Sequence, residues 1–174
     1  VLLFECDLIF EPAALDRLLA APHANVALVD RHARGMDGTV LEVEQGIVTQ
    51  VIPPHRQGAN FDFSDKYKTL NIYRFSQDFC TGDLRKLLAF YAHAIDDNCY
   101  YELILGVLIF MQRQTIHAAI LDGERWAEID DPNDLDAARF LFAPANRRQI
   151  LDEAHGGFWR RDVQDFCYLR NMYF

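Results

Sequence analysis

The first 30 residues alternate between apolar runs and an amphipathic segment, and this alternation limits the possible folds more than any other feature. VLLFECDL (residues 1–8) is an apolar run that turns acidic at its end, and NVALVD (25–30) is a second apolar run. EPAALDRLLAA (11–21) lies between them, with apolar residues at helical spacing and a proline near its start. Continuous apolar runs are typical of buried parallel strands, and a strand, a helix and a strand in this order form a βαβ unit. We therefore predict an α/β fold with a partial, Rossmann-like mixed sheet, mostly parallel and flanked by helices.

The rest of the chain adds strands and helices together with a β-hairpin insertion. TVLEVE and IVTQVI alternate apolar and polar residues around Gln45-Gly46, which predicts the hairpin. The apolar run at 100–113 fits a buried helix, with a strand as the alternative. By the same periodicities we expect strands at 68–75 and 116–121 and helices at 78–95 and 132–143.

Charge and cysteine spacing exclude several functions. The formal net charge is −9 and the pI is about 5.0, whereas a general nucleic-acid binder needs a basic face to contact phosphates. The four cysteines form no C-x-x-C pair, which indicates reduced thiols. The longest apolar stretch, 103–111, is far shorter than the roughly 20 residues that cross a bilayer. We predict a cytoplasmic protein that binds neither nucleic acid nor a membrane.

Acidic residues follow two of the predicted strands. Glu5 and Asp7 come after VLLF, and Glu128, Asp130 and Asp131 come after the strand IHAAIL. Ligands of open α/β sheets bind beyond the carboxyl ends of the strands. Carboxylates that meet there suit magnesium, which prefers oxygen ligands and often keeps waters and substrate phosphates as its other ligands.

A helix start is the alternative explanation for the same acids. Carboxylates in the first turn of a helix interact favourably with the helix dipole, and Pro132 marks such a start. Asp134 and Asp136 fit this structural role. Asp7 and Asp130 each lie just past a predicted buried strand, so they are the candidate metal ligands.

Other common catalytic motifs do not occur in the sequence. The histidines form no i, i+4 pair and no H-x-H, which argues against a zinc site. Neither serine lies in G-x-S-x-G, which argues against a triad hydrolase. The sequence contains no G-x-G-x-x-G and no P-loop, so it lacks a glycine-rich phosphate cradle.

Six segments in one order resemble the nucleoside triphosphate transferases. They are ECDLIFEP, NVALVD, MDGTVLEVEQGIVTQV, KTLNIYRFS, CYYE and WAEIDDPNDLDAA, and the resemblance runs from about residue 1 to residue 143. The nearest resemblance is to the phosphocholine cytidylyltransferase-like group, which includes relatives that act on aminoalkylphosphonates or sugar phosphates. It implies that an oxygen of a phosphate or phosphonate acceptor attacks the α-phosphorus of a nucleoside triphosphate, with CTP expected, and that pyrophosphate leaves. Asp7 and Asp130 resemble the family's two magnesium ligands, which are the catalytic residues.

The same resemblance suggests residues for the acceptor, such as phosphocholine or 2-aminoethylphosphonate. Tyr101 and Glu102 are similar to the place where choline-recognising members put an aromatic beside an acid, a pair that suits an ammonium group. Lys68 either meets the acceptor's phosphate or is a surface lysine. Asp37 either lines the same pocket or serves a tight turn with the glycine that follows it. Trp126 belongs either to the core or to the wall of the substrate site.

The chain departs from the family pattern at its beginning. Family members begin with a glycine-rich loop that ends in a basic residue, and no such loop precedes the first metal ligand here. We therefore expect a fragment, with residues 1–146 forming the C-terminal portion of a nucleotidyltransferase-like domain. Residues 147–174 would be a tail, similar to the junction that leads into an aminotransferase domain in some relatives. Whether the fragment is active alone stays open.

The early apolar strand suggests self-association. In a partial sheet the strand at 1–6 would lie at an edge, and a long apolar edge strand tends to pair with another chain. We expect a homodimer or a swapped assembly.

Three other functions stay open at this point. The domain could bind a partner or regulate a fused enzyme without turnover. It could transfer nucleotides to sugar phosphates, or it could hydrolyse a small molecule in the same acidic crevice.

Overall fold

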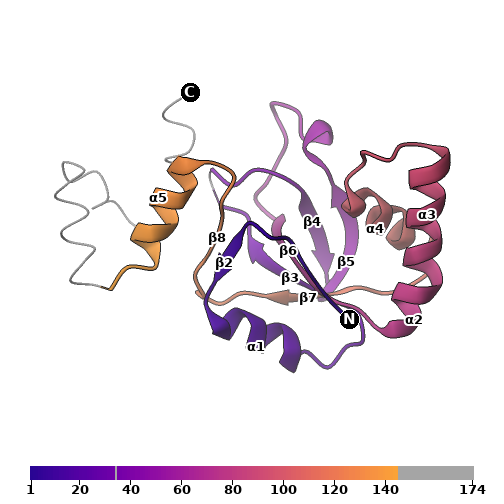
Figure 1. Ribbon diagram of the computed structural model, residues 1–174, viewed down its shortest axis with the longest axis horizontal. Coiled ribbons are helices and arrows are strands. Elements are labelled where there is room, and N and C mark those ends of the chain that lie inside the picture. Colours follow the sequence, from indigo (N-terminus) through magenta and orange to yellow (C-terminus); the bar gives the residue numbers. More distant parts are fainter. Residues whose placement is uncertain (34, 145–174) are drawn as a thin grey trace.

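The computed structural model describes residues 1–33 and 35–144, which form a mixed sheet, a small two-stranded ribbon and surrounding helices (Figure 1). The predicted tail at 147–174 and the boundary after residue 146 lie outside the described residues. The strands are β1 (Leu2–Phe4), β2 (Leu8–Phe10), β3 (Val26–Arg31), β4 (Val40–Glu44), β5 (Ile47–Ile52), β6 (Tyr67–Arg74), β7 (His117–Ile120) and β8 (Trp126–Glu128). The helices are α1 (Pro12–Ala20), the 3-10 turn η1 (Pro54–Arg56), α2 (Gln77–Phe79), the π-helical turn η2 (Cys80–Leu84), α3 (Arg85–Ala94), α4 (Tyr101–Phe110) and α5 (Pro132–Leu141).

The main sheet is mixed and closes on itself through one strand. Its order is β1-β6-β3-β7-β5-β4, and β4 also pairs with β6. One side of β6 pairs along β3, and its other side is divided between β4 and β1. Because β6 takes part in all three pairings, the side chains that it carries lie at the centre of the fold.

The prediction of a mixed sheet flanked by helices is confirmed, but the expectation that most strands would be parallel is wrong. Within 1–33 and 35–144, only β3 and β7 pair in parallel, and the other pairings are antiparallel. The expectation of one continuous buried strand in VLLFECDL is also wrong. Its two halves become β1, at the edge of the main sheet, and β2, in the ribbon with β8. The polar break at Glu5–Asp7 lets the chain leave one sheet and enter the other.

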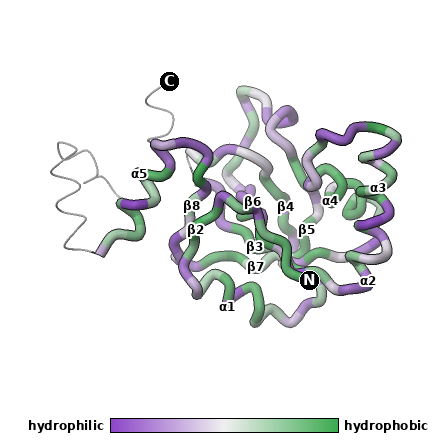
Figure 2. The backbone as a smooth tube through the Cα atoms, viewed as in Figure 1, coloured by the Kyte–Doolittle hydropathy of each residue, from purple (hydrophilic) through white to green (hydrophobic). Residues whose placement is uncertain are grey.

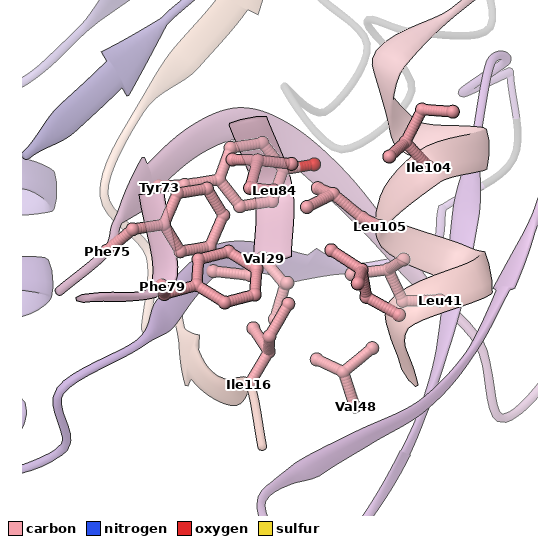
Figure 3. Packing of buried hydrophobic residues seen from close by; sticks show 12 residues of the cluster. Val29, Leu41, Val48, Tyr73, Phe75, Phe79, Leu84, Ile104, Leu105 and Ile116 are labelled. Atoms are coloured by element: carbon pink, nitrogen blue, oxygen red, sulfur yellow. The ribbon is translucent and has the colours of Figure 1, made fainter. Parts of the chain in front are cut away.

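Two apolar clusters cover the two faces of β3. Val26 and Leu28 pack with Leu18 of α1, whereas Ala27 and Val29 face the second cluster. Figure 3 shows this second cluster, in which aromatic side chains of β6 and α2 meet aliphatic side chains of α4 and the hairpin. Burial on both faces explains why NVALVD is apolar at consecutive positions, as predicted.

Several other predicted elements are confirmed with adjusted ends. The hairpin β4–β5 turns at Gln45 and Gly46, both with positive φ, as a two-residue turn of this kind requires. The apolar run at 100–113 is helical, as α4. The helix expected at 78–95 is divided, because a π-helical turn separates α2 from α3.

The helices lie around the sheet rather than on one side of it. In Figure 1, α1 contacts β3 and β6, α4 contacts β5, and α5 contacts β8. Figure 2 shows that the central strands are mainly hydrophobic, whereas hydrophobic and hydrophilic stretches alternate along α3 and the outer loops are largely hydrophilic. In the part of the chain that the structure describes, no helix is long and apolar enough to span a membrane.

Replacing Phe79 by alanine should destabilise the fold by about 3–5 kcal/mol, because the ring is fully buried and its removal leaves a cavity. The ring packs against Phe75 with its centroid 4.7 Å away. Phe110→Ala is the matched control, since 88% of that residue is exposed, and it should change the free energy of unfolding by less than about 0.5 kcal/mol. Urea denaturation of both variants measures the difference, and equal effects would contradict this assignment of the core.

Candidate functional site

The β2–β8 ribbon brings the two predicted metal ligands to the same place. Leu8 pairs with Glu128, and the backbone N–H of Ile129 donates to the carbonyl oxygen of Asp7 at 2.8 Å. The antiparallel pairing therefore places Asp7 beside the segment that carries Asp130, although the two are more than 120 positions apart in the sequence. The expectation that the strand 116–121 leads directly into the acids is wrong, because the short strand β8 follows it and delivers Glu128.

Asp7 has a carboxylate oxygen suited to a cation. Its Oδ1 is buried and has no hydrogen-bond partner in the described residues. A buried acceptor left in this state is costly unless a ligand satisfies it, and Asp7 with Asp130 offers the oxygen donors that magnesium prefers. A magnesium ion held by these two carboxylates would take its other ligands from substrate phosphates and water. Within 1–33 and 35–144, no group of three or more His, Cys, Asp or Glu side chains could hold a metal.

The next acids along the chain cap a helix, as predicted for Asp134. The Asp131 carboxylate accepts from the backbone N–H groups of Asn133 and Asp134, and the Asp134 carboxylate accepts in return from the backbone of Asp131. This reciprocal capping box satisfies N–H groups at the start of α5. Asp134 also accepts from the backbone N–H of Asp130 at 3.0 Å, so the cap holds the backbone of a candidate ligand.

Lys68 is buried, not a surface lysine. It is 3% exposed, and its Nζ lies 3.2 Å from Oε2 of Glu128. Gly38 lies against the same ammonium group, because a Cβ atom at that position would be 2.6 Å from Nζ, and its φ is +85°. The loop that contains Asp37 can therefore lie against Lys68 only because residue 38 is a glycine. Asp37 is exposed.

Trp126 joins the ribbon to the main sheet. Its indole Nε1 donates to Oδ2 of Asp30 at 2.9 Å, and its ring packs against the cluster around α1. These contacts account for the half-buried position of Trp126 by packing. Its side chain thus connects the end of β3 with β8.

Tyr101 and Glu102 lie at the start of α4 and face other carboxylates. Glu102 is 5% exposed, and its Oε2 and the Tyr101 hydroxyl are buried without a hydrogen-bond partner in the part of the chain that the structure describes. Burial raises the pKa of Glu102, and the Glu5 and Glu128 carboxylates raise it further while Lys68 opposes them. Burial likewise raises the pKa of Glu128, which Lys68 lowers in part.

Three further residues belong to this cluster without having been predicted as site residues. Glu5 and Glu128 were among the acids at strand ends that suit magnesium, but only Asp7 and Asp130 were predicted as ligands. Asn71 lies within a predicted strand. Asn71 Nδ2 donates to Oε2 of Glu5 at 2.6 Å. The one signal for Asn71 was its residue type, since asparagine is depleted in strands.

Asp7 and Asp130 lie beside the β2–β8 ribbon, whereas Tyr101 and Glu102 lie at the start of α4. Glu5 and Glu128 both interact electrostatically with Glu102. Lys68 and Glu128 form an ion pair that belongs to the same cluster.

Two curated proteins are similar to the chain along its whole length. It is 33% identical to CMP-5'-(3-aminopropyl)phosphonate synthase of Streptomyces rubellomurinus (strain ATCC 31215) and 27% identical to the uncharacterized protein y4rO of Sinorhizobium fredii (strain NBRC 101917 / NGR234). The chain spans 28% and 27% of their lengths, a little more than a quarter of each. No protein-family model matches the chain.

Two solved structures share the fold at low sequence identity. The inositol-1-phosphate CTP transferase from T. maritima matches with a TM-score of 0.51 and 13% identity, over 87% of this chain and 54% of that one. A putative glucose-1-phosphate thymidylyltransferase from Bacillus anthracis, in complex with a sucrose, matches with a TM-score of 0.53 and 10% identity, over 79% of this chain and 52% of that one.

Replacing Glu102 by glutamine should make the fold more stable at neutral pH. The raised pKa means that the folded chain holds this proton more tightly than the unfolded chain does. The stabilising contribution of the protonated carboxyl is complete below about pH 4.5 and is lost as the pH rises through the folded-state pKa. The melting temperature of Glu102→Gln should therefore match the original chain near pH 4.5 and exceed it by a few degrees at pH 8. Thermal denaturation at both pH values tests this, and a difference independent of pH would contradict it.

Proposed function

We propose that this chain is part of a nucleoside triphosphate transferase, and that the whole protein transfers a cytidylyl group from CTP to a small phosphonate or phosphate acceptor. The observation that carries the proposal is the approach of Asp7 to the Asp130 segment across the β2–β8 ribbon, beside a buried cluster with one lysine and several carboxylates. The similarity to an enzyme named for the cytidylylation of an aminoalkylphosphonate supports this choice of reaction.

The proposed reaction depends mainly on how the protein positions its two substrates. An acceptor oxygen forms a bond to the α-phosphorus of CTP, the bond between that phosphorus and the bridging oxygen to the β-phosphate breaks, and pyrophosphate leaves. Magnesium, held by Asp7 and Asp130, would neutralise negative charge on the phosphates. No covalent protein nucleophile takes part. The rest of the nucleotide site is not assigned to residues of this chain.

The chain's own residues orient the acceptor in this proposal. Lys68, already paired with Glu128, supplies positive charge for the acceptor's phosphonate. Tyr101 and Glu102 receive its ammonium group at the other end of the site, where burial strengthens the attraction between charges. Aminoalkylphosphonates and phosphocholine both carry this pair of charges. A sugar phosphate carries no cation to meet Glu102, so this buried acid favours the first two acceptors.

Asp7→Asn and Asp130→Asn should each lower the rate of pyrophosphate release about 100-fold or more, because each removes a charged oxygen donor from the phosphates. The assay uses the whole protein with CTP, magnesium and 3-aminopropylphosphonate or 2-aminoethylphosphonate. Asp136→Asn is the matched control, since this acid forms an i, i+3 pair with Arg139 on α5, and it should leave the rate unchanged.

No pyrophosphate release with any nucleotide and acceptor would overturn the proposed activity. Acceptor binding without release would instead support a non-catalytic binding domain. Phosphate release without a cytidylylated product would support a hydrolase.

We also propose that this chain forms a homodimer along β1. This strand pairs with β6 on one side, and Leu2 and Phe4 are 42% and 38% exposed. An apolar edge strand of this kind favours pairing with a second copy. Leu2→Lys should convert the dimer to a monomer in light scattering at micromolar concentration, whereas Leu19→Lys, which changes an exposed leucine on α1, should not. A monomeric original protein would contradict the proposal.

A further inference from the structure

Strand β6 is interrupted by a bulge at its buried centre. Val29 of β3 pairs with Thr69 and Ala27 pairs with Tyr73, so one residue of β3 lies opposite three residues of β6. Asn71, the middle residue of these three, has a φ of +56° and is 5% exposed. A non-glycine residue in the left-handed region is uncommon, and bulges often occur beside active sites, where they turn a side chain in a new direction.

The bulge directs the Asn71 side chain toward Glu5. The hydroxyl of Thr69 accepts from the Asn71 backbone N–H at 3.1 Å and also contacts the Tyr73 hydroxyl at 2.9 Å. The Tyr73 hydroxyl donates to Oδ1 of Asn71, and Nδ2 of Asn71 donates to Glu5 at 2.6 Å. With both ends of its amide engaged, Asn71 holds the Glu5 carboxylate in one orientation.

Glu5 lies close to the groups at the ammonium end of the site. Asn71 contacts both Glu5 and Tyr73, and the Tyr73 ring meets the Tyr101 ring edge-on with its centroid 6.1 Å away. The Glu5 carboxylate also helps to raise the pKa values of Tyr101 and Glu102. The Tyr101 hydroxyl and Oε2 of Glu102 are buried and lack hydrogen-bond partners within residues 1–33 and 35–144. Lys68 pairs with Glu128, and no salt bridge of the described chain involves Glu5 or Glu102. The cluster therefore offers three acceptors and excess negative charge to a ligand.

We infer that Glu5, oriented by Asn71, completes the acceptor pocket with Tyr101 and Glu102 and makes it select a primary ammonium group over a quaternary one. The inference rests on the proposed function and deepens it. A primary ammonium has three N–H donors, one for each of the three acceptors. A trimethylammonium has none, so its binding would leave the buried oxygens without hydrogen bonds. A site that hydrogen-bonds its ligand strongly rejects an analogue that lacks the donor, because the buried acceptors then stay unpaired. An apolar pocket discriminates much less between ligands that differ by one methyl group.

Three ligands separate hydrogen bonding from charge: 3-aminopropylphosphonate, its N-trimethyl derivative and propylphosphonate. The dissociation constant of each for the whole protein is measured by isothermal titration calorimetry with magnesium present, and turnover with CTP is measured separately. The primary amine should bind about 100-fold or more tightly than the trimethyl derivative. Equal affinities for these two, or no binding of the amine, would overturn the inference.

Two variants test the roles of Glu5 and Asn71. Glu5→Gln should weaken binding of the primary amine at least 10-fold and leave propylphosphonate binding unchanged. Asn71→Gly keeps the backbone conformation but removes the amide, so it should reproduce part of this loss. In turnover, both should raise the KM for the amine without changing the KM for CTP. Gln45→Gly is the matched control, because Gln45 has a φ of 51° in the exposed hairpin turn, and it should change none of these values.

The outcomes separate this inference from the proposed function. Selective binding of the primary amine without pyrophosphate release would overturn the proposed function and support the pocket. Turnover of all three acceptors with equal KM would support the function and overturn the selectivity. An equal loss of amine and propylphosphonate binding in Glu5→Gln would assign Glu5 a general structural role and overturn its place in the pocket.

Discussion

The antiparallel pairing of β2 with β8 is the contact on which the rest of the site depends. It joins the first ten residues of the chain to the segment before α5, and the backbone hydrogen bond from Ile129 to Asp7 extends the pairing to the two candidate metal ligands. The ribbon is anchored from both sides. Trp126 donates to Asp30 at the end of β3, and Glu11 and Arg125 form an ion pair whose arginine also donates to the carbonyl of Leu141. This ribbon is the contact that brings the segments of Asp7 and Asp130 together.

The second constraint is electrostatic. The site gathers three glutamates near a single lysine: Glu102 is buried, and Glu5 and Glu128 are half-buried. Burial raises the pKa values of Glu102 and Glu128. An excess of buried negative charge is unfavourable in a folded chain unless protons or a cation compensate it. Such a cluster therefore sacrifices stability in the free protein and gains affinity for a cationic group. The bulge at Asn71 also costs stability, because the backbone of Asn71 has an uncommon positive φ. This conformation lets the Asn71 side chain orient the Glu5 carboxylate.

Local patterns predicted the elements well and their pairing poorly. The hairpin around Gln45-Gly46, the strand NVALVD and the helix after Pro132 follow from turn chemistry, a run of consecutive apolar residues and helix capping. Each of these signals can be read from neighbouring positions in the sequence. The division of VLLFECDL between two sheets and the antiparallel direction of most strands depend on partners distant along the chain. An apolar run looks the same whether its neighbour is parallel or antiparallel, so the βαβ pattern led to the wrong direction for most pairs.

The residue types available for chemistry can be read from the sequence alone: acids just after apolar runs, an aromatic beside an acid, and no zinc, triad or glycine-rich phosphate motif. Which of these residues meet depends on the folded chain. It buried Lys68 against Glu128, left acceptor atoms of Asp7, Tyr101 and Glu102 without partners in the described residues, and turned Asn71 toward Glu5. The physical reason is that hydrogen bonding and desolvation depend on distances in space of a few ångströms, whereas sequence patterns report only on neighbours along the chain.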